Sequence, residues 1–298
     1  MTGVLLLDKP EGITSFWAAA QLRRVCGEKK IGHTGTLDPM ASGLLPVLLG
    51  GATKFADLLP SHDKAYRATF LLGAETDTLD ITGRVVRQRY VRASAADVQD
   101  ALGRFRGSIT QVPPMFSAVS QNGVRLYALA RQGIEVERKT RTVEIYRLEL
   151  TEADDVKGAY TIDVQCSAGT YIRSLVSDLG ERLGCGAVLT ALRRTGANGL
   201  SVDDAHTLDE LRALSPRALD AYVLPVDAVL ADYPAVTVTQ NQSVRFRNGG
   251  ALDLARVRCA DTDAVLYRVY NPQGTFLGLG ARNNEKNELA VRRLLIER

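Results

Sequence analysis

The chain has 298 residues, of which 45% are hydrophobic and 24% are charged, and its formal net charge is +3. Because this length exceeds the ~150 residues of an average domain, we expect one large domain and a small additional module. No segment approaches the ~18 consecutive apolar residues that cross a membrane, and the N-terminus has no basic-then-apolar signal pattern. We therefore expect a cytoplasmic protein without a membrane partner.

The cysteines and histidines indicate no metal site. The four cysteines form no C-x-x-C pair, and three histidines are too few and too scattered to bind a metal. The chain also lacks G-x-x-x-x-G-K-[ST] and G-x-G-x-x-G, the phosphate-binding patterns of nucleotide sites. We therefore predict neither a metal nor a cofactor. These residues are Cys26, Cys166, Cys185, Cys259, His33, His62 and His206.

The N-terminal region predicts a strand followed by a helix. Residues 4–7 form a short apolar run that is typical of a buried strand. Ser15 then has the position of a helix N-cap, because apolar residues follow it at helical spacing. The expected apolar face of this helix consists of Ala18, Leu22, Val25 and Cys26.

Residues 32–43 predict a tight loop with an unusual backbone path. Glycine permits positive φ, and proline fixes φ and removes a donor, so a stretch rich in both specifies its own shape. The apolar run 44–49 then predicts a buried strand, which places Asp38 where this strand begins. Asp-Pro often opens a turn. His33, five residues upstream, favours a functional carboxylate instead.

A second strand is predicted directly after a short helical segment. Residues 52–59 suit one or two helical turns that carry Lys54. Residues 64–72 alternate as a strand, with Tyr66 on the same side as Ala68 and Phe70. A tyrosine in this position is either a core residue or a platform on which an unpaired base stacks. The next segment, residues 75–80, is rich in Asp, Glu and Thr, and we interpret it as a solvated turn.

The middle of the chain combines a helix, an insertion and two further strands. Ser94 is a plausible N-cap for a helix that reaches residue 105. Residues 117–142 have few long apolar side chains, one short helical piece at 125–131 and a net charge of +3, so they predict a protruding insertion. Residues 142–150 and 160–166 alternate as strands.

A helix beginning at Gly169-Thr170 places Arg173 in its first turn. A cation there faces the positive end of the helix dipole, which is unfavourable by about 0.3–1 kcal/mol when exposed. A specific anionic partner would explain why an arginine occupies this position. The alternative is a surface arginine that points away at little cost. The expected buried face of the helix is Ile172, Leu175, Val176, Leu179 and Leu183.

The C-terminal part predicts a small β module. Residues 208–214 suit a helix, and Asp232-Tyr233-Pro234 marks a boundary. Beyond it, short β-like runs at 255–259, 265–270, 275–279 and 289–294 alternate with turn residues. Residues 233–298 contain ten Lys and Arg against six Asp and Glu, whereas residues 1–232 have a net charge of −1. This asymmetry suits contact with phosphates, and the positive charges include Arg245, Arg247, Arg256, Arg258 and Arg268.

Several motifs together resemble the TruB family of tRNA pseudouridine synthases, and they recur in family order over most of the chain. They are GHTGTLDP at 32–39, ATK at 52–54, KAYR at 64–67, GAETDTLD at 73–80, QVPPMFSA at 111–118, RLYALAR at 125–131, CSAGTYIRSL at 166–175 and LRR at 192–194.

The resemblance implies a fold, a reaction and a substrate. The expected fold is α+β, with a mixed, largely antiparallel sheet flanked by helices. A thumb at 117–142 would be inserted in the catalytic domain at 1–231, and a PUA-like RNA-binding domain would follow at 232–298. The implied reaction converts uridine 55 in the T-arm loop of tRNA to pseudouridine. It cleaves the N-glycosidic bond and re-attaches the base through C5 after flipping the nucleotide out of the loop.

The resemblance also implies the site residues. Asp38 is the expected catalytic carboxylate, and attack on C1′, addition to C6 and removal of the C2′ proton remain open for it. Arg173 would keep Asp38 ionised and orient it. Tyr66 would stack on the base and assist removal of the C5 proton. The expected substrate-binding residues are His33, for which a structural loop role stays open, and Lys54, Tyr171, Leu192 and Arg131.

Three alternatives compete with this interpretation. Long charged tails often accompany guide-RNA-dependent synthases of the dyskerin type; the chain lacks them, and its thumb insertion favours the stand-alone type. We also expect a monomer. A non-catalytic tRNA-folding chaperone would not require Asp38, Tyr66 and Arg173 together. Ser61-His62-Asp63-Lys64 matches the S-x-x-K pattern of some hydrolases, but S-D-N and K-T-G are absent, and we set this alternative aside.

Overall fold

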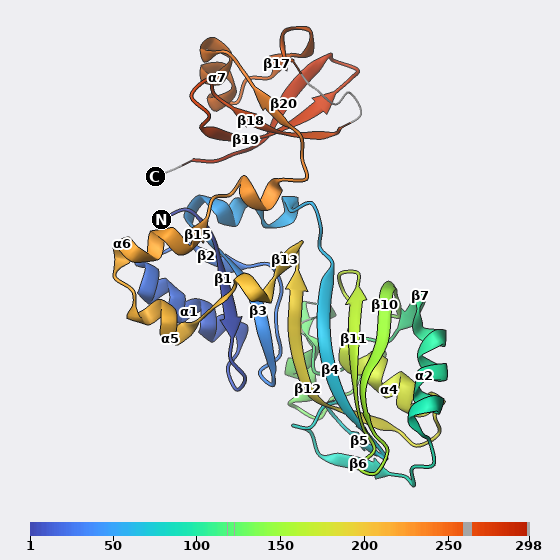
Figure 1. Ribbon diagram of the computed structural model, residues 1–298. Coiled ribbons are helices and arrows are strands. Elements are labelled where there is room, and N and C mark those ends of the chain that lie inside the picture. Colours follow the sequence, from blue (N-terminus) through green and yellow to red (C-terminus); the bar gives the residue numbers. More distant parts are fainter. Residues whose placement is uncertain (118, 122, 259–263, 297–298) are drawn as a thin grey trace.

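The computed structural model describes residues 1–117, 119–121, 123–258 and 264–296. Figure 1 shows a large part and a smaller part, the latter formed by the C-terminal residues. The large part contains an 11-stranded sheet, and the smaller part contains a five-stranded sheet. Within the described residues, no helix is both long enough and apolar enough to cross a membrane.

The large sheet is mixed and largely antiparallel, as the resemblance predicts. Its strands follow the order β14-β1-β3-β12-β4-β11-β10-β7, in which only the pairs β1–β14 and β3–β12 are parallel. Short strands β2, β13 and β15 pair beside this path. The bounds are β1 (Gly3–Lys9), β2 (Ile31–His33), β3 (Ala41–Leu49), β4 (Lys64–Leu72), β7 (Gly107–Gln111), β10 (Arg141–Asp154), β11 (Ala159–Cys166), β12 (Ala187–Ala197), β13 (Leu200–Ser201), β14 (His206–Thr207) and β15 (Val223–Leu224).

Strand β12 lies at the centre of this sheet, although the sequence analysis did not predict it. It pairs in parallel with β3, where Arg194 is opposite Gly43, and antiparallel with β4, where Arg194 is opposite Tyr66. Two adjacent arginines near its middle obscure the apolar pattern of a core strand. Gly43 adopts φ +100, and a Cβ there would lie 2.3 Å from the carbonyl oxygen of Arg194, so no other residue fits this crossing.

Helix α1 (Ser15–Cys26) begins one residue earlier than we expected from the sequence. Its N-cap is Thr14, whose side chain accepts a hydrogen bond from the backbone N–H of Trp17. Ser15 is instead the first helical residue. Its buried Oγ hydrogen-bonds both the backbone N–H and the carbonyl of Leu37, at 2.8 and 3.0 Å. The hydroxyl therefore fixes the helix to the loop that carries Asp38.

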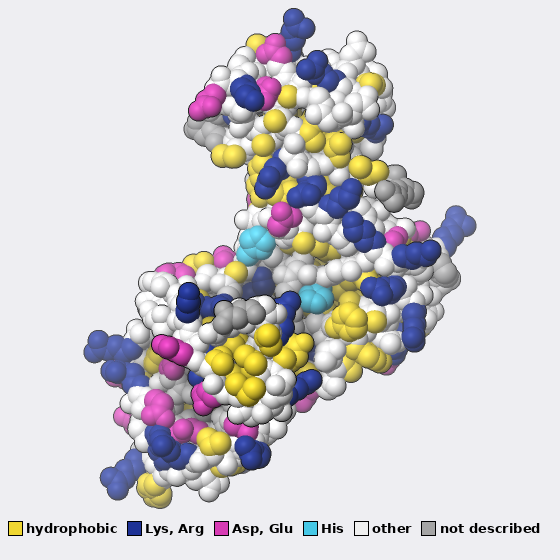
Figure 2. Space-filling view, turned by 180° about the vertical axis from the view of Figure 1, so that it is seen from behind, with side chains coloured by type: hydrophobic (Ala, Val, Ile, Leu, Met, Phe, Trp, Pro, Cys, Tyr) yellow, Lys and Arg dark blue, Asp and Glu magenta, His cyan; other side chains and the backbone are white. Residues whose placement is uncertain are grey.

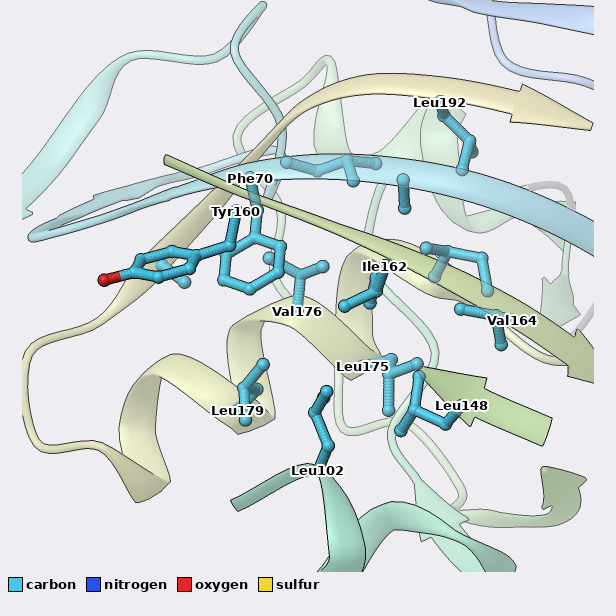
Figure 3. Packing of buried hydrophobic residues seen from close by; sticks show 14 of the residues in the cluster. Phe70, Leu102, Leu148, Tyr160, Ile162, Val164, Leu175, Val176, Leu179 and Leu192 are labelled. Carbon is cyan, nitrogen blue, oxygen red and sulfur yellow. The ribbon is translucent and has the colours of Figure 1, made fainter. Parts of the chain in front are cut away.

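One face of the sheet is covered by α4 (Ile172–Arg182) and α2 (Ala95–Leu102). Figure 3 shows α4 directing Leu175, Val176 and Leu179 toward the sheet, where the rings of Phe70 and Tyr160 stack at 5.7 Å. Ser94 caps α2 as predicted and forms a capping box. Helix α4, however, begins at Ile172 rather than at Gly169-Thr170, because Gly169 adopts φ +84 in the preceding turn.

Replacement of Phe70 by alanine tests how much this core contributes. The side chain is fully buried, so Phe70→Ala should lower the free energy of unfolding by about 3–5 kcal/mol through reduced burial and a residual cavity. Urea denaturation followed by circular dichroism measures the change. Tyr90, which is 83% exposed, provides the matched control, and Tyr90→Ala should change stability by less than about 0.5 kcal/mol. Equal effects of the two substitutions would contradict this assignment of the core.

The remaining segments of the large part are short. A 3₁₀ helix, η1 (Gly50–Leu58), carries Lys54, and β5 (Ala74–Thr76) pairs with β6 (Val85–Gln88). In the predicted thumb, β8 (Ser120–Gln121) pairs with β9 (Val124–Arg125), and α3 (Leu126–Ala130) matches the expected helical piece. Residues 118 and 122 of the thumb lie outside the described residues. The predicted helix at 208–214 is α5 (Leu208–Ala213), and α6 (Pro216–Leu219) follows it.

The C-terminal sheet has the strand order β16-β18-β19-β20-β17. The β-like run at 255–259 was predicted wrongly, because Leu254–Arg256 forms a 3₁₀ turn; residue 259 lies outside the described residues. The sequence analysis also missed α7 (Gln240–Arg247), which is polar but is started by a capping box between Thr239 and Gln242. The strands are β16 (Ala235–Thr237), β17 (Leu252–Asp253), β18 (Leu266–Tyr270), β19 (Phe276–Asn283) and β20 (Glu288–Leu294).

The C-terminal module packs directly against the large part. The rings of Phe276 and Phe55 lie 6.1 Å apart within a shared apolar cluster. Arg268 donates to the carbonyls of Tyr233 and Asp227 at 2.8 and 3.3 Å. Arg268 is therefore committed to this interface, which corrects its place among the arginines that we expected to contact phosphates.

Candidate active site

A cavity of about 870 Å³ opens where the loop containing Asp38 meets β4, β12 and the thumb. This volume is within the ~300–1,000 Å³ typical of pockets that hold a small ligand. Figure 2, seen from behind, shows a hollow in this face with Lys and Arg side chains gathered around it. The lining includes the continuous stretches 34–40 and 167–173. Single residues and short pieces complete it, among them Thr78, Asp80, Thr82, Phe116, Ser117, Tyr127, Arg131, Lys64, Tyr66, Leu192 and Arg194.

Asp38 is held in a rigid loop at the cavity wall. Its neighbours Leu37 and Met40 are buried and anchor the loop in the core. The backbone N–H of Ala41 donates to the carbonyl of Asp38 at 3.0 Å, and that of Gly12 donates to Pro39 at 2.8 Å. The side chain of Asp38 is 35% exposed, so its carboxylate opens toward the cavity while its backbone is fixed.

The structure brings Arg173 and Asp38 together. An Nη2···Oδ2 distance of 2.8 Å joins them, and the arginine side chain is only 5% exposed. The same guanidinium donates to the carbonyls of Phe116 at 2.8 Å and Thr78 at 2.9 Å. These bonds fix the direction of the charge, because a planar guanidinium with several partners has little rotational freedom.

Asp80 is a second carboxylate on Arg173, and the sequence analysis missed it. Its Oδ2 lies 3.4 Å from Nη1 of Arg173, and its side chain is 5% exposed. The hydroxyls of Thr78 and Thr82 donate to Oδ1 at 2.8 and 2.5 Å. The interpretation of residues 75–80 as a solvated turn is therefore wrong. The Thr-x-Asp-x-Thr spacing was the available signal, since threonines two residues away can saturate a buried carboxylate.

The pKa of Asp38 is raised above its usual range, mainly because burial disfavours the charged form. The charge of Arg173 opposes this rise, and that of Asp80 adds to it. We expected Arg173 to keep the carboxylate ionised; it acts in that direction, but burial outweighs it. A carboxyl with a raised folded-state pKa favours folding at low pH, and this contribution is lost as the pH rises through that pKa. Ionisation of Asp38 in the folded protein therefore lowers the free energy of unfolding.

Tyr66 lines the cavity and is coupled to a buried arginine. Arg194, which is 1% exposed, lies opposite Tyr66 in the pairing of β12 with β4, and it donates to the carbonyls of Leu44 at 2.7 Å and Gly35 at 3.2 Å. Burial raises the pKa of Tyr66, and the positive charge of Arg194 opposes that shift. Arg194 lies in the LRR motif, but its role as the link between β4 and the Asp38 loop was not predicted.

Lys9 is a further buried cation beside the loop. Its Nζ donates to the carbonyls of Pro10 and Ile13, each at 2.8 Å, and the side chain is fully buried. Burial lowers its pKa to about 8, although the charge of Asp38 acts in the opposite direction. The sequence offered no signal for this role, because a lysine at the end of an apolar strand is usually solvated.

Three other predicted residues line the cavity: Tyr171, Leu192 and Arg131. Tyr171 is the N-cap of α4, and the guanidinium of Arg141 lies 5.3 Å from the centre of its ring. Leu192 comes from β12, and Arg131 from the end of α3. Each is thus positioned by a different element around the pair formed by Asp38 and Arg173.

His33 and Lys54 are not among the described residues that line the cavity. His33 lies in β2 opposite Val47, and its Nδ1 is buried with no hydrogen-bond partner among the described residues. Burial also lowers its pKa, which favours the neutral imidazole. His62, which was not among the predicted catalytic or substrate-binding residues, does line the cavity. Within the part of the chain that the structure describes, no cluster of His, Cys, Asp and Glu has the arrangement of a metal site.

Three family models match successive segments of the chain. The N-terminal domain of the TruB family pseudouridylate synthases matches residues 23–172. The C-terminal domain of tRNA pseudouridylate synthase B matches residues 173–231, and the C-terminal region of pseudouridine synthase II TruB matches residues 234–295.

Full-length relatives agree with these models. The chain is 45% identical to the tRNA pseudouridine synthase B of Thiobacillus denitrificans, over 98% of this chain and 95% of the relative. It is 40% identical to that of Escherichia coli K12, over 100% of this chain and 96% of the relative. Among solved structures, a Cbf5-Nop10-Gar1 complex matches with a TM-score of 0.73 at 24% identity, covering 100% of this chain and 86% of that chain. This last likeness shows the pseudouridine synthase fold.

Proposed function

This chain belongs to the TruB family of pseudouridine synthases, and from that membership and the geometry of the cavity we propose that it isomerises uridine 55 in the T-arm loop of tRNA to pseudouridine. The observation that carries the proposal is the pair formed by Asp38 and Arg173 at 2.8 Å, on the wall of a cavity large enough for a nucleotide. The substrate is tRNA because the full-length relatives are tRNA pseudouridine synthases.

Asp38 would supply the carboxylate that the reaction requires. The N-glycosidic bond must break and a bond from C5 to C1′ must form, and a carboxylate can attack C1′, add to C6 or remove the C2′ proton. Arg173 serves all three routes, because it fixes the carboxylate and favours its ionised form. A cavity of this volume would also hold the detached base beside the sugar.

Tyr66 would stack on the target base. Its ring lies at the cavity wall, and Arg194 lies opposite it on the neighbouring strand β12. This position suits a planar base and would allow the phenol to assist removal of the C5 proton. Leu192 and Tyr171 would complete the wall, and Arg131 would contact the RNA from the thumb.

The target nucleotide must leave its stack to enter the cavity, at a cost of a few kcal/mol. His33 and Lys54 lie outside the cavity lining, so any role in flipping would be exerted on the RNA around the target rather than on the target base. Thr34, the residue after His33, does line the cavity, so His33 is adjacent in sequence to the cavity wall. We further propose that the enzyme acts as a monomer and without a guide RNA.

The division at residue 231 and RNA binding by residues 232–298 are part of the proposal. Within this module Arg247 and Arg258 are exposed, whereas Arg268 is committed to the interface. Arg247→Gln/Arg258→Gln should weaken tRNA binding and lower the slope of log K against log salt concentration by about 0.9 for each phosphate that the variant no longer binds. Filter binding between 50 and 200 mM salt measures this slope. An unchanged slope would remove these two arginines from the RNA interface.

Tritium release from [5-³H]uridine-labelled tRNA transcript tests the reaction itself. The wild-type protein, without added metal or nucleotide, should release the label from uridine 55 as C5 exchanges its proton for a carbon bond. A transcript with cytidine at that position is the control and should release none. If the protein binds tRNA but releases no tritium, a tRNA-folding chaperone replaces the proposed enzyme.

A further inference from the structure

Helix α1 buries mostly small side chains and exposes large aromatic ones. Its buried positions are mostly small, namely Ser15, Ala18 and Ala19 beside Leu22, whereas Phe16 is 76% exposed and Trp17 is 43% exposed. A helix at the surface of a domain normally buries its large apolar side chains and exposes its polar ones. Two adjacent exposed aromatic residues therefore need a partner other than the core.

The exposed side of α1 is also basic. Arg23 and Arg24 are exposed in its last turn, and the helix contains no acidic residue. Phe16 is seven and eight residues before them, which places all three on one side of the helix. On the neighbouring α5, Asp209 is paired with Arg212 at 3.1 Å.

The segment after the helix extends this positive surface. Lys29 and Lys30 are exposed, while Glu28 between them and the helix is paired with the N-terminal ammonium group at 3.3 Å. Glu11, in the loop before the helix, is the nearest acidic residue upstream in sequence that could offset the positive charge on this side. We call Phe16, Trp17, Arg23, Arg24, Lys29 and Lys30 the α1 surface.

This surface is continuous with the cavity. Thr14, the N-cap of α1, lines the cavity, and Ser15 hydrogen-bonds the backbone of Leu37, one residue before Asp38. At 1.5 Å per residue, Arg24 lies about 12 Å farther along the helix than Phe16. Figure 1 shows α1 at the edge of the large part, and Figure 2 shows hydrophobic and basic side chains next to one another along that edge. The aromatic end thus meets the cavity rim, and the basic end points away from it.

We propose that the α1 surface is a second contact site for the RNA substrate. Phe16 and Trp17 stack on unpaired bases next to the flipped nucleotide, and Arg23, Arg24, Lys29 and Lys30 bind phosphates of the strand that leaves the cavity. Aromatic side chains beside cations are the combination by which proteins hold single-stranded nucleic acid. This inference rests on the proposed function, because it assumes that RNA occupies the cavity.

Trp17 makes the inference directly measurable, because it is the one tryptophan of the chain. Titration with tRNA transcript should quench its fluorescence and protect it from acrylamide, since a stacked base covers the indole. Phe16→Ser should weaken tRNA binding by at least about fivefold. The control is Tyr90→Ser, which removes an aromatic ring that is 83% exposed on another part of the protein and should leave binding unchanged. Unchanged Trp17 emission while filter binding shows a complex would overturn the stacking contact.

The phosphate contacts have a separate test. Arg23→Gln/Arg24→Gln should lower the slope of log K against log salt concentration by about 1.4–1.8, which corresponds to two phosphates. Arg104→Gln/Arg182→Gln is the matched control, because it changes the net charge by the same amount. Both arginines are exposed, Arg104 in the 3₁₀ turn after α2 and Arg182 at the end of α4. Equal slopes for the two double variants would overturn the phosphate contact. Equal melting temperatures of both variants and the wild type verify that they are folded.

Two further outcomes separate this inference from its alternatives. If the wild type releases no tritium from tRNA, the proposed function fails, whatever Trp17 reports. If it releases tritium but tRNA does not change the Trp17 fluorescence, and Arg23→Gln/Arg24→Gln does not change the salt slope, only the α1 surface fails. A blue shift of Trp17 emission with phosphatidylglycerol vesicles, together with no response to tRNA, would instead assign the surface to anionic membranes and overturn the RNA contact.

Discussion

Asp38→Asn is expected to eliminate measurable tritium release from tRNA while the dissociation constant for tRNA stays within a few fold of the wild-type value. Asparagine has nearly the same size but can neither accept a proton at neutral pH nor act as a nucleophile. Loss of a proton-transfer group costs about 10²–10⁴-fold in rate, and loss of a nucleophile can approach about 10⁶-fold. Single-turnover assays with enzyme in excess measure the rate, and filter binding measures the affinity.

The matched control is Asp100→Asn, since Asp100 is exposed on α2 and remote from the cavity lining. This control should retain the wild-type rate. Loss of tRNA binding together with activity in Asp38→Asn would indicate misfolding or a different position for the reacting nucleotide. Retained activity would show that another group performs the chemistry, and Asp80, a cavity-lining carboxylate on the same arginine, would be the first candidate.

The local elements could be read from the sequence because their information is local. The strand predicted at 64–72 is β4 with the same bounds, since its alternation distinguishes the two faces. The helix after Ser94 was recognised from its cap and its apolar spacing. The position of Arg173 at a helix start likewise indicated an anionic partner. A cation is unfavourable at the positive end of the helix dipole, so a carboxylate elsewhere in the chain was needed to offset this energy.

The residues that the sequence concealed are those whose surroundings are assembled from distant segments. Asp80 resembles a turn residue until Arg173, 93 positions later, becomes its partner. Arg194 and Lys9 carry charges into the interior without a carboxylate at hydrogen-bonding distance among the described residues, and mainly carbonyl oxygens receive their hydrogen bonds. Polar residues on apolar strands are ordinarily evidence against burial. This rule is broken around the Asp38 loop, where Arg194 donates to the loop carbonyl of Gly35 and Lys9 is a buried cation whose charge acts on Asp38.

In the C-terminal module, too, the sequence did not reveal which polar residues are buried or helical. Arg268 looked like one of several surface arginines, yet its bond to the carbonyl of Asp227 makes it part of the interface with the large part. The helix α7 was missed because its composition is polar, and its N-terminus depends on a capping box rather than on apolar periodicity. Composition thus identified a basic module correctly but could not tell which of its charges face solvent.

Arg173→Met is expected to slow the reaction at pH 7 by at least about 10²-fold and to move the acidic limb of the pH–rate profile to higher pH. The physical reason is the balance of effects on the pKa of Asp38. Burial and the charge of Asp80 raise this pKa, and Arg173 is the first opposing influence. Without the guanidinium the carboxyl stays protonated to higher pH, so the active ionised form appears later in the titration. Single-turnover rates between pH 5 and 9 give the profile.

Two companion variants separate the loss of charge from damage to the fold. Arg173→Lys keeps the charge but cannot reach Asp38, Thr78 and Phe116 together, so it should lose rate with a smaller shift of the acidic limb. Arg173→Met/Asp80→Asn removes the unpaired carboxylate as well, so its acidic limb should return toward lower pH. A double variant that is folded but keeps the limb of Arg173→Met would contradict the electrostatic role of Asp80. An unshifted limb in folded Arg173→Met would mean that Arg173 orients Asp38 without controlling its ionisation.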